Sequence, residues 1–243
     1  MKTKLKTFGP KLAGNSIVYV IDNDGGARAS TVTLLHSIGL DTQDFKTADE
    51  FLATSLSDLP SCLVLDVRLR GLSGFDVQNY LTANGIGMPV IFATAHGDIA
   101  MSVRAMKAGA LDFLTKPFRD QDLLDAVLSG LSTDEKRRSS ARNIATLRQL
   151  YEFLTPRERQ VMTMAANGLS NAQIAASLSV SSVTVKIHRG TAMRKMQSKS
   201  VADFVLKASA LGLIEPELNF ECNANLHRAT GKSHPSEYAT GLV

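Results

Sequence analysis

The chain has 243 residues, of which 44% are hydrophobic, and it carries a formal net charge of +4 at pH 7. This length suffices for two domains of roughly 100–150 residues each, whereas its apolar runs are far shorter than the ~18 residues of a membrane helix. The two cysteines, Cys62 and Cys222, do not indicate a disulfide framework. Composition thus excludes a membrane protein and a disulfide-rich secreted protein, and we expect a cytoplasmic protein with no signal peptide and no membrane partner.

The positive charge is concentrated in one part of the chain. Residues 156–214 contain 8 basic and 2 acidic side chains, a net charge of +6, and residues 132–155 carry a net charge of +2. Residues 1–131 and residues 215–243 each carry a net charge of −2. A basic segment of this kind is the electrostatic footprint of a nucleic-acid-binding module, although charge alone is equally compatible with an ordinary solvated surface.

The first half of the chain alternates between strands and helices. After a tail over residues 1–14, which we expect to be flexible, apolar runs of strand length alternate with helical patterns over residues 15–131. This five-fold alternation predicts an α/β domain, in which helices cover both faces of a doubly wound, five-stranded parallel sheet. The helices are predicted over Gly26–Ser37, Ala48–Ser57, Phe75–Asn84, Ile99–Lys107 and Asp120–Leu131.

A polar, charge-dense segment separates this domain from the next. Residues 132–151 begin with charged residues and become amphipathic, which predicts a linker that runs into a helix. Residues 152–213 predict an all-α domain of four helices, because two capping boxes and a tight turn give the pattern of a helix-turn-helix. Residues 214–243 lack periodicity, and we expect a disordered or loosely docked tail. The four helices are predicted from Pro156 as far as Gly168, over Asn171–Leu178, over residues 182–196 and over residues 201–211.

Polar groups follow four of the predicted strands, at the edge where ligand sites form in a parallel α/β sheet. Asp66 closes the apolar run that begins at Cys62. Asp22–Asp24 follow a second strand, Thr94 a third and Lys116 a fourth. Acids, a hydroxyl and an ammonium would therefore converge around Asp66, a set that suits phosphoryl transfer to this carboxylate with a divalent metal.

Each of these groups has a chemical role in such a transfer. Asp22 and Asp66 can supply carboxylates to Mg²⁺, which prefers oxygen ligands. Lys116 can neutralise charge on the phosphoryl group, and the Thr94 hydroxyl can hydrogen-bond one of its oxygens. Taken alone, each residue is more often an ordinary cap, loop or turn residue, so the hypothesis rests on their occurring together at four strand ends.

The predicted helix over residues 182–196 has two unlike faces. Its apolar face, which includes Val185, Ala192 and Met196, should pack on the other helices. The opposite face carries small, apolar and cationic groups that can read base edges, with Lys186 toward guanine acceptors and Ile187 against a thymine methyl. The flanks suit phosphate contacts, and a solvent-facing helix with ordinary charges is the alternative. The residues predicted to contact DNA are Thr184, Lys186, Ile187, His188, Arg189, Gly190, Arg194 and Lys195.

Residues 16–131 resemble the receiver domain of two-component response regulators. The motifs that carry the resemblance are Val20–Asp24, Leu65–Leu69 with Leu72–Gly74, Thr94–Asp98, Ala105–Phe113 and Lys116–Phe118. The resemblance implies a flavodoxin-like fold in which Asp66 accepts a phosphoryl group from a sensor histidine kinase. It also implies that Asp22, Asp66 and the backbone carbonyl of Arg68 bind Mg²⁺. Phe113 matches an aromatic switch whose side chain moves inward as Thr94 engages the phosphoryl group.

Motifs in the second domain resemble the LuxR-type helix-turn-helix, and they are Leu154–Arg159, Gly168–Ala176, Val183–Arg189 and Met193–Met196. The whole chain therefore resembles the FixJ/NarL class of response regulators. The resemblance implies a third helix that enters the major groove of double-stranded DNA and a fourth that often serves dimerisation. We expect phosphorylation to control homodimerisation and promoter binding, and no enzymatic activity beyond the receiver's own phosphoryl transfer and dephosphorylation.

Several positions depart from the family's pattern. Asn23 stands where a second acid is usual; its amide oxygen can still bind a metal but brings no charge, so Mg²⁺ affinity should fall. Asp24 would compensate only in part. Arg70 stands where proline is common, and Gly25 and Gly26 loosen the start of the first helix. Two alternatives therefore remain open: a regulator that binds DNA independently of phosphorylation, and a signalling adaptor that does not bind DNA.

Overall fold

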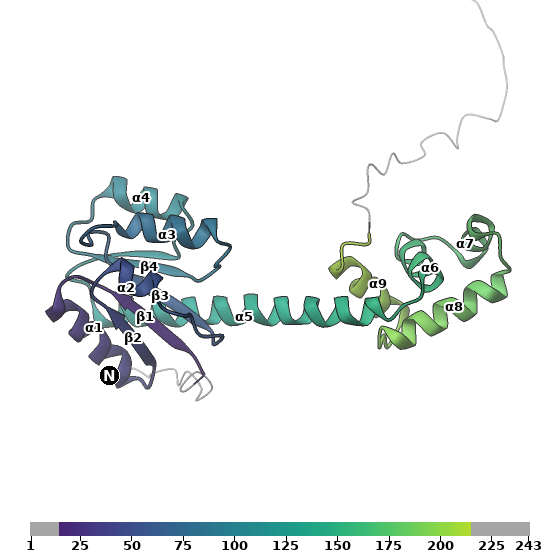
Figure 1. Ribbon diagram of the computed structural model, residues 1–243, viewed down its shortest axis with the longest axis horizontal. Coiled ribbons are helices and arrows are strands. Elements are labelled where there is room, and N and C mark those ends of the chain that lie inside the picture. Colours follow the sequence, from purple (N-terminus) through teal and green to yellow (C-terminus); the bar gives the residue numbers. More distant parts are fainter. Residues whose placement is uncertain (1–14, 215–243) are drawn as a thin grey trace, which may run out of the picture. The chain divides into compact units, whose positions relative to one another are not determined.

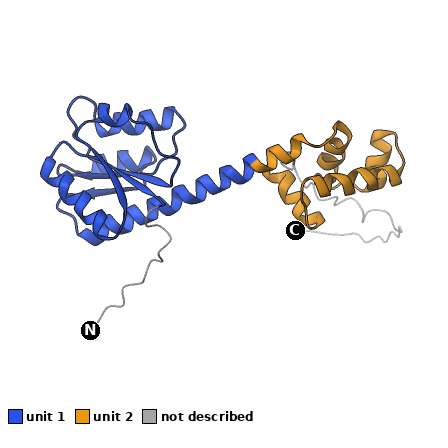
Figure 2. Ribbon diagram, turned by 60° about the horizontal axis from the view of Figure 1, so that its bottom comes forward, with its two compact units in different colours: residues 1–145 blue, residues 146–243 orange. Residues whose placement is uncertain are grey.

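The computed structural model of the chain describes residues 15–214, in two compact units that divide between residues 145 and 146 (Figure 2). The predicted tails over residues 1–14 and, apart from Ile214, over residues 214–243 lie outside the described residues. Within the described range, no helix has both the length and the apolar composition that are needed to cross a membrane.

The first unit is built on a five-stranded parallel sheet with the strand order β2-β1-β3-β4-β5 (Figure 1). Every residue of β3 and β4 is buried, as expected for strands that are covered on both faces. The winding reverses at β1, so the carboxyl ends of β1 and β3 form the switch point where ligands bind in sheets of this type. The strands are β1 Ile17–Ile21, β2 Asp41–Phe45, β3 Ser61–Leu65, β4 Val90–Thr94 and β5 Asp112–Thr115.

Helices cover both faces of the sheet, and the strand pleat sends alternate side chains to each face. Val18 and Val20 of β1 pack in a core with α1 and α5, whereas Tyr19 and Ile21 pack in a core with α2, α3 and α4. The prediction of a doubly wound α/β domain is confirmed. The helices that begin in this unit are α1 Gly25–Ser37, α2 Ala48–Leu52, α3 Gly74–Ala83, α4 Ile99–Lys107 and α5 Asp120–Glu152.

The second predicted helix is shorter than expected. It ends at Leu52 instead of Ser57, so the predicted end was wrong. Beyond α2, side chains bind the backbone: the Ser57 N–H donates to the Tyr19 hydroxyl at 2.9 Å, and the Leu59 N–H donates to Ser57 Oγ at 3.3 Å. These bonds replace the helical ones, and the partner in β1 lies 38 positions away, where a periodic pattern gives no sign of it.

The second unit packs its helices around one apolar core that includes Val161, Ile174, Val185 and Phe204. The predicted capping boxes are present at the starts of α6 and α7. Ser179, with a φ of 54°, ends α7 in a left-handed conformation and begins the turn into α8. The helix-turn-helix pattern is therefore confirmed. After the end of α5, the described helices are α6 Pro156–Ala166, α7 Asn171–Leu178, α8 Ser182–Lys195 and α9 Val201–Ala210.

The fifth helix does not end at Leu131, as was predicted, but continues to Glu152. The segment predicted as a linker over residues 132–151 is thus helical throughout. The division between the two compact units, after residue 145, falls inside this segment and not at its start. Its first residues therefore belong to the first unit.

A buried carboxylate, that of Asp134, ties the continued helix to the sheet. Its Oδ1 accepts hydrogen bonds from Arg137 Nε and Nη2 at 2.9 and 2.6 Å, and its Oδ2 accepts from Arg138 Nε at 2.6 Å and the Ser61 N–H at 2.9 Å. Arg138 also pairs with Asp58 at 2.9 Å. Burial opposes the ionisation of Asp134, but the bonds from Arg138, the Ser61 N–H and Arg137 outweigh burial, so the pKa of Asp134 lies below its ordinary value. The first charges of the predicted linker segment therefore bind one another and the amino end of β3.

We expect Asp134→Asn to lower the free energy of unfolding of the first unit by about 3 kcal/mol at pH 7, because two arginines lose their buried counter-charge. Urea unfolding of the full chain, followed by circular dichroism, measures the difference, and Glu135→Gln at an exposed neighbour is the matched control. The depressed pKa of Asp134 means that its contribution is present above the unfolded pKa of about 4 and is lost as the pH falls through the folded value. The difference should therefore shrink in acid, and equal stability at pH 7 would contradict this role.

Candidate functional site

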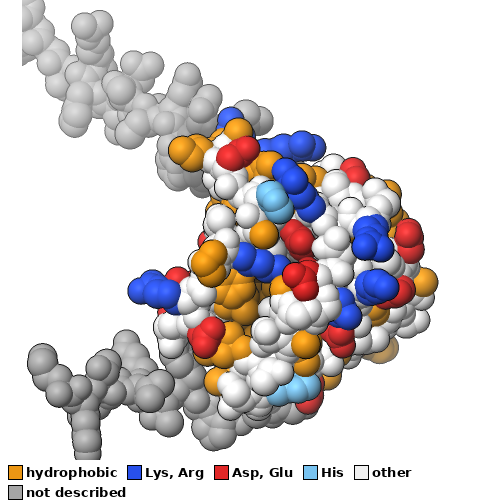
Figure 3. Space-filling model, turned by 90° about the vertical axis from the view of Figure 1, so that its left-hand side faces the viewer, with side chains coloured by type: hydrophobic (Ala, Val, Ile, Leu, Met, Phe, Trp, Pro, Cys, Tyr) orange, Lys and Arg blue, Asp and Glu red, His pale blue; other side chains and the backbone are white. Residues whose placement is uncertain are grey.

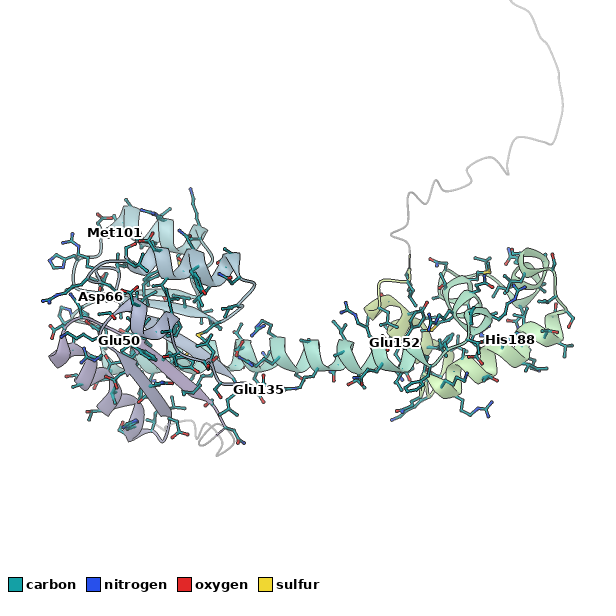
Figure 4. All side chains as sticks on the ribbon, viewed as in Figure 1. Glu50, Asp66, Met101, Glu135, Glu152 and His188 are labelled. Carbon is teal, nitrogen blue, oxygen red and sulfur yellow. The ribbon has the colours of Figure 1, made fainter. Side chains whose placement is uncertain are left out.

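Two buried carboxylates lie at the carboxyl ends of neighbouring strands. Asp22 follows β1 and is 4% exposed, and Asp66 follows β3 and is 9% exposed. The Asp66 N–H donates to the Ile21 carbonyl oxygen at 2.9 Å, which holds the two strand ends together. Figure 4 labels Asp66, and Figure 3 faces the same side of the first unit, where acidic side chains lie near the middle with lysines and arginines around them.

Both oxygens of Asp22 have partners. Oδ1 accepts a hydrogen bond from the Asp24 N–H at 2.9 Å, and Oδ2 forms an ion pair with Lys116 Nζ. Lys116 follows β5, and the Lys116–Pro117 peptide bond is cis. Although Lys116 follows the edge strand β5, its ammonium reaches Asp22 at the carboxyl end of β1.

Asp66 keeps one oxygen open. Its Oδ1 accepts from the Arg68 N–H at 3.2 Å, and no group in residues 15–214 donates a hydrogen bond to Oδ2. Thr94, at the end of β4, is fully buried; its Oγ1 accepts from the His96 N–H at 3.4 Å, and its carbonyl accepts from the Lys116 N–H at 2.8 Å. An open carboxylate oxygen at the same sheet edge as an ammonium and a hydroxyl is suited to attack an electrophilic phosphorus.

The oxygen donors at this edge fit a hard divalent cation with few carboxylate ligands. Asp22 and Asp66 would supply carboxylates, and the predicted further ligands would be the Asn23 amide oxygen and the Arg68 backbone carbonyl; Mg²⁺ completes such sets with water. Within the described residues, no three His, Cys, Asp or Glu side chains gather into a metal site. Asn23, next to Asp22, brings an amide in place of a further carboxylate.

Asp24 caps the first helix of the sheet domain with one of its oxygens. Its Oδ1 accepts from the Ala27 N–H at 3.3 Å and from the Gly26 N–H at 2.8 Å at the start of α1. These two bonds hold the pKa of Asp24 below its usual value. Because the cap uses Oδ1, only the other oxygen of Asp24 could add negative charge to the cluster.

Phe113 of β5 is half-buried and touches the loop that follows Thr94. Its ring centroid lies 6.1 Å from that of Phe92, which in turn lies 5.2 Å from that of Phe75. A Cβ added at Gly97 would lie 2.8 Å from Phe113 Cε1, so the loop backbone passes directly against the ring. Because the two are in close contact, the loop and the ring cannot move independently. No role for Gly97 was predicted from the sequence, because only the packing shows that a side chain there would collide with Phe113.

The two faces of α8 match the prediction. Val185, Ala192 and Met196 are buried in the core of the second unit. On the opposite face Val183 is 68% exposed and Ile187 is 63% exposed, and the remaining groove-facing residues predicted there, Lys186, Gly190 and Arg194, are exposed as well. A Cβ added at Gly190 would meet no atom within 4 Å, so this position leaves open space over the helix.

The flanking residues are held by neighbouring side chains. Thr184 Oγ1 lies 2.8 Å from Ser181 Oγ at the cap of α8, and Arg189 Nη1 donates to Asn171 Oδ1 of α7 at 3.2 Å. His188, labelled in Figure 4, is half-exposed. The Asn171 contact fixes the direction of the Arg189 side chain while most of its donors remain available.

Lys195, also predicted as a DNA contact, has a partner inside the unit. Its Nζ lies 2.7 Å from Glu158 Oε2 and 3.2 Å from the Phe153 carbonyl oxygen. Glu158 is 5% exposed and also accepts from the Thr155 N–H at 2.8 Å. Burial opposes the ionisation of Glu158, yet the bonds from Lys195 and Thr155 outweigh burial and lower its pKa. The sequence analysis missed this link between α8 and α6, because its two residues are 37 positions apart.

Comparison with known proteins assigns a family to each unit. Residues 18–128 match the model of the response regulator receiver domain, and residues 152–208 match the model of bacterial regulatory proteins of the luxR family. The second match supports DNA binding and counts against the alternative of an adaptor that does not bind DNA.

Several relatives are similar over most of their length. Nodulation protein W of Bradyrhizobium diazoefficiens is 50% identical over 198 residues, which cover 82% of this chain and 87% of that protein. Transcriptional regulatory protein FixJ of Azorhizobium caulinodans is 39% identical over 198 residues, which cover 81% of this chain and 93% of that protein. Among solved structures, the response regulator StyR has a TM-score of 0.71 at 44% identity, covering 80% of this chain and 98% of that one. The chain belongs to the FixJ/NarL class of response regulators, transcriptional regulators that join a receiver domain to a LuxR-type DNA-binding domain.

Proposed function

We propose that a sensor histidine kinase phosphorylates Asp66 and that phosphorylation controls homodimerisation and promoter binding in the cytoplasm. The observation that carries the proposal is the Asp66 carboxylate, which is buried beside Asp22 and keeps Oδ2 without a hydrogen-bond donor among residues 15–214. Its other oxygen is held by the Arg68 N–H, so the open oxygen has a fixed direction.

In the proposed transfer, Asp66 Oδ2 attacks the phosphorus of a phosphohistidine. The new O–P bond forms as the P–N bond breaks, and the imidazole of the kinase leaves and takes up a proton. Asp22, Asn23, Asp66 and the Arg68 carbonyl would hold Mg²⁺, which when bound supplies positive charge to the phosphoryl oxygens. Lys116 adds a fixed positive charge at the same edge, and the Thr94 hydroxyl donates to a phosphoryl oxygen. The receiver thus catalyses only its own phosphorylation and dephosphorylation.

The switch follows from the contact between the loop after Thr94 and the ring of Phe113. When Thr94 turns toward the phosphoryl group, the backbone at Gly97 moves with it and the ring moves inward. The surface of α4, β5 and α5 then changes. α4 already exposes three apolar side chains on this surface, Ile99 at 84%, Val103 at 45% and Met106 at 48%, and such a stripe suits burial between two copies of the chain.

For DNA recognition, we propose that α8 lies in the major groove. Lys186 and Ile187 are exposed where they would meet base edges, and Gly190 permits a close approach. Arg189, oriented by Asn171, would contact a phosphate from the flank. A homodimer would present two such helices to a two-fold operator.

One observation favours a second candidate, a regulator that binds DNA without phosphorylation. Asn23 leaves two carboxylates at the proposed metal site, and one oxygen of Asp24 caps α1. Two carboxylates can hold Mg²⁺, but the affinity should be lower than that of a site with a third acid in place of Asn23. In this version, the receiver would influence DNA binding through its fold and not through its phosphorylation state.

Asp66→Asn is expected to abolish the band shift that acetyl phosphate and Mg²⁺ produce in Phos-tag electrophoresis, because an amide cannot accept the phosphoryl group. Light scattering and DNA affinity, measured on the same samples, should then show no response to acetyl phosphate. Asp49→Asn, at an exposed carboxylate of α2, is the matched control and should respond as the wild type does. A variant at position 66 that still dimerises on treatment would refute the switch, and a wild type that binds DNA without ever shifting would establish the second candidate.

Lys186→Ala should weaken binding to a duplex selected from random sequence by about 1–3 kcal/mol, because the variant loses a contact to a base edge. Binding to a scrambled duplex should change less, so the ratio of specific to non-specific affinity falls. Fluorescence anisotropy at several salt concentrations measures both affinities. Lys199→Ala, at an exposed lysine beyond α8, is the control, and an equal loss on both duplexes would reassign Lys186 to a phosphate.

Lys195→Met should lower the free energy of unfolding of the second unit by about 2 kcal/mol, because Glu158 loses a charged hydrogen-bond partner in a buried position. The ratio of specific to non-specific DNA affinity should stay unchanged. The lowered pKa of Glu158 means that the stability difference is present at neutral pH and shrinks as the pH falls through that pKa. Unchanged unfolding combined with weaker DNA binding would restore Lys195 as a DNA contact.

A further inference from the structure

We infer that Arg28 is a positioning residue for the proposed metal ligand Asp22, and that it acts by fixing the turn between β1 and α1. The inference rests on the proposed Mg²⁺ site and adds a residue that touches neither the metal nor the phosphoryl group. None of the family motifs in the sequence includes Arg28.

The contacts of Arg28 join three parts of the site edge. Its Nη1 donates to the Asp22 backbone carbonyl at 2.7 Å, and its Nε donates to Asp44 Oδ2 in β2 at 2.9 Å. Its backbone N–H donates to the Asp24 carbonyl at 2.9 Å. The Arg28 side chain is 20% exposed, whereas that of Asp44 is 48% exposed. A single planar guanidinium therefore spans the ends of two neighbouring strands while its backbone belongs to the first turn of α1.

The Asp22 N–H donates to the Phe45 carbonyl at 3.2 Å and Asp24 Oδ1 caps α1, and among the contacts of this turn the Arg28 guanidinium binds the turn and β2 at once. Gly25 and Gly26 begin α1 without side chains, and glycine keeps the most backbone freedom of any residue. The Asp24 N–H holds Asp22 Oδ1 at 2.9 Å, so the direction of the Asp22 carboxylate depends on where this turn lies. The bond to the Asp22 carbonyl and the bond to Asp44 anchor the turn to the sheet.

The orientation of Asp22 matters more here because Asn23 contributes no charge. With two carboxylates in the donor set, an ion at this edge would depend on both pointing correctly. Partners that orient a metal ligand from behind typically change metal affinity by 10–100-fold when they are removed. Arg28 orients Asp22 in the same way, but it binds the backbone carbonyl of Asp22 and not its carboxylate.

If Arg28 acted only through its charge, its removal would change the Mg²⁺ affinity in the opposite direction. A guanidinium beside an acidic cluster repels a divalent cation, so its removal would tighten Mg²⁺ binding if charge were its only contribution. Loss of positioning weakens Mg²⁺ binding instead. The direction of the change therefore separates the two explanations.

The test measures Mg²⁺ binding to the full chain by isothermal titration calorimetry. We expect Arg28→Gln to raise the dissociation constant about tenfold. Arg28→Lys should raise it as well, since one ammonium keeps the charge but cannot reach both acceptors. Lys46→Gln removes a cation that follows β2 and whose ammonium makes no ion pair among the described residues; as the matched charge control, it should leave binding unchanged or tighten it.

A second measurement needs no metal and guards against a variant that is merely unstable. In Mg²⁺-free buffer, the amides of Gly26 and Ala27 should exchange hydrogen faster in Arg28→Lys than in the wild type, while the amides of β3 keep their protection. Loss of protection throughout the sheet would instead show general destabilisation and overturn the inference. Wild-type or tighter Mg²⁺ affinity in both Arg28 variants would also overturn it, with the proposed site intact. A wild type that binds no Mg²⁺ would overturn the proposed site together with the inference.

Discussion

The placement of two buried carboxylates at neighbouring strand ends is the constraint on which the site of the first unit depends. The parallel sheet forces Asp22 and Asp66 onto neighbouring strand ends, and the bond from the Asp66 N–H to the Ile21 carbonyl keeps them there. Like charges that are close together and shielded from water destabilise each other. Lys116 offsets part of this repulsion at Asp22, and the N–H groups of Asp24 and Arg68 bind one oxygen of each acid. The two carboxylates are thus held in place, but the one ammonium paired with Asp22 does not balance the charge of both.

Lys116 links the Asp22 carboxylate to the loop that begins at Thr94. Its ammonium binds Asp22, and its backbone N–H binds the carbonyl of Thr94 at 2.8 Å. The loop that starts at Thr94 passes against the ring of Phe113 at Gly97. Because close packing allows few intermediate positions, the loop and the ring favour discrete arrangements. Lys116 and the loop after Thr94 thus join the Asp22 carboxylate to the ring of Phe113 through direct contacts.

Local patterns in the sequence predicted most of the fold. Apolar runs located β3 and β4, capping residues located the starts of α6 and α7, and periodicity separated the two faces of α8 correctly. Each of these signals lies within a few neighbouring residues. The polar groups that follow the strands could also be placed at one edge from the sequence, since a parallel sheet brings all carboxyl ends to one edge.

What the sequence did not reveal depends on polar contacts between distant residues. Asp134 binds the N–H of Ser61 across 73 positions, and nothing in the local pattern showed that the start of the predicted linker is bound to the sheet and continues α5. The ion pair of Lys195 with Glu158, 37 positions away, was not predicted, and its contact with DNA stays a prediction. Arg28 and Asp44 are 16 positions apart. A charged residue looks the same in sequence whether its partner is a phosphate, water or a buried carboxylate.

Hydrogen bonding separates the buried carboxylates of this chain by role. Asp134 accepts bonds on both oxygens from two arginines and a backbone N–H, and Glu158 accepts from Lys195 and Thr155. Acids that are satisfied in this way are held ionised and anchor helices. Asp66 is also buried, yet within the described residues its Oδ2 has no donor. This oxygen is not among the described buried atoms that lack a partner, so it reaches the surface of the fold and is open to water. Asp66 Oδ2 is therefore accessible to a group from outside the chain, which the proposed phosphorylation of Asp66 requires.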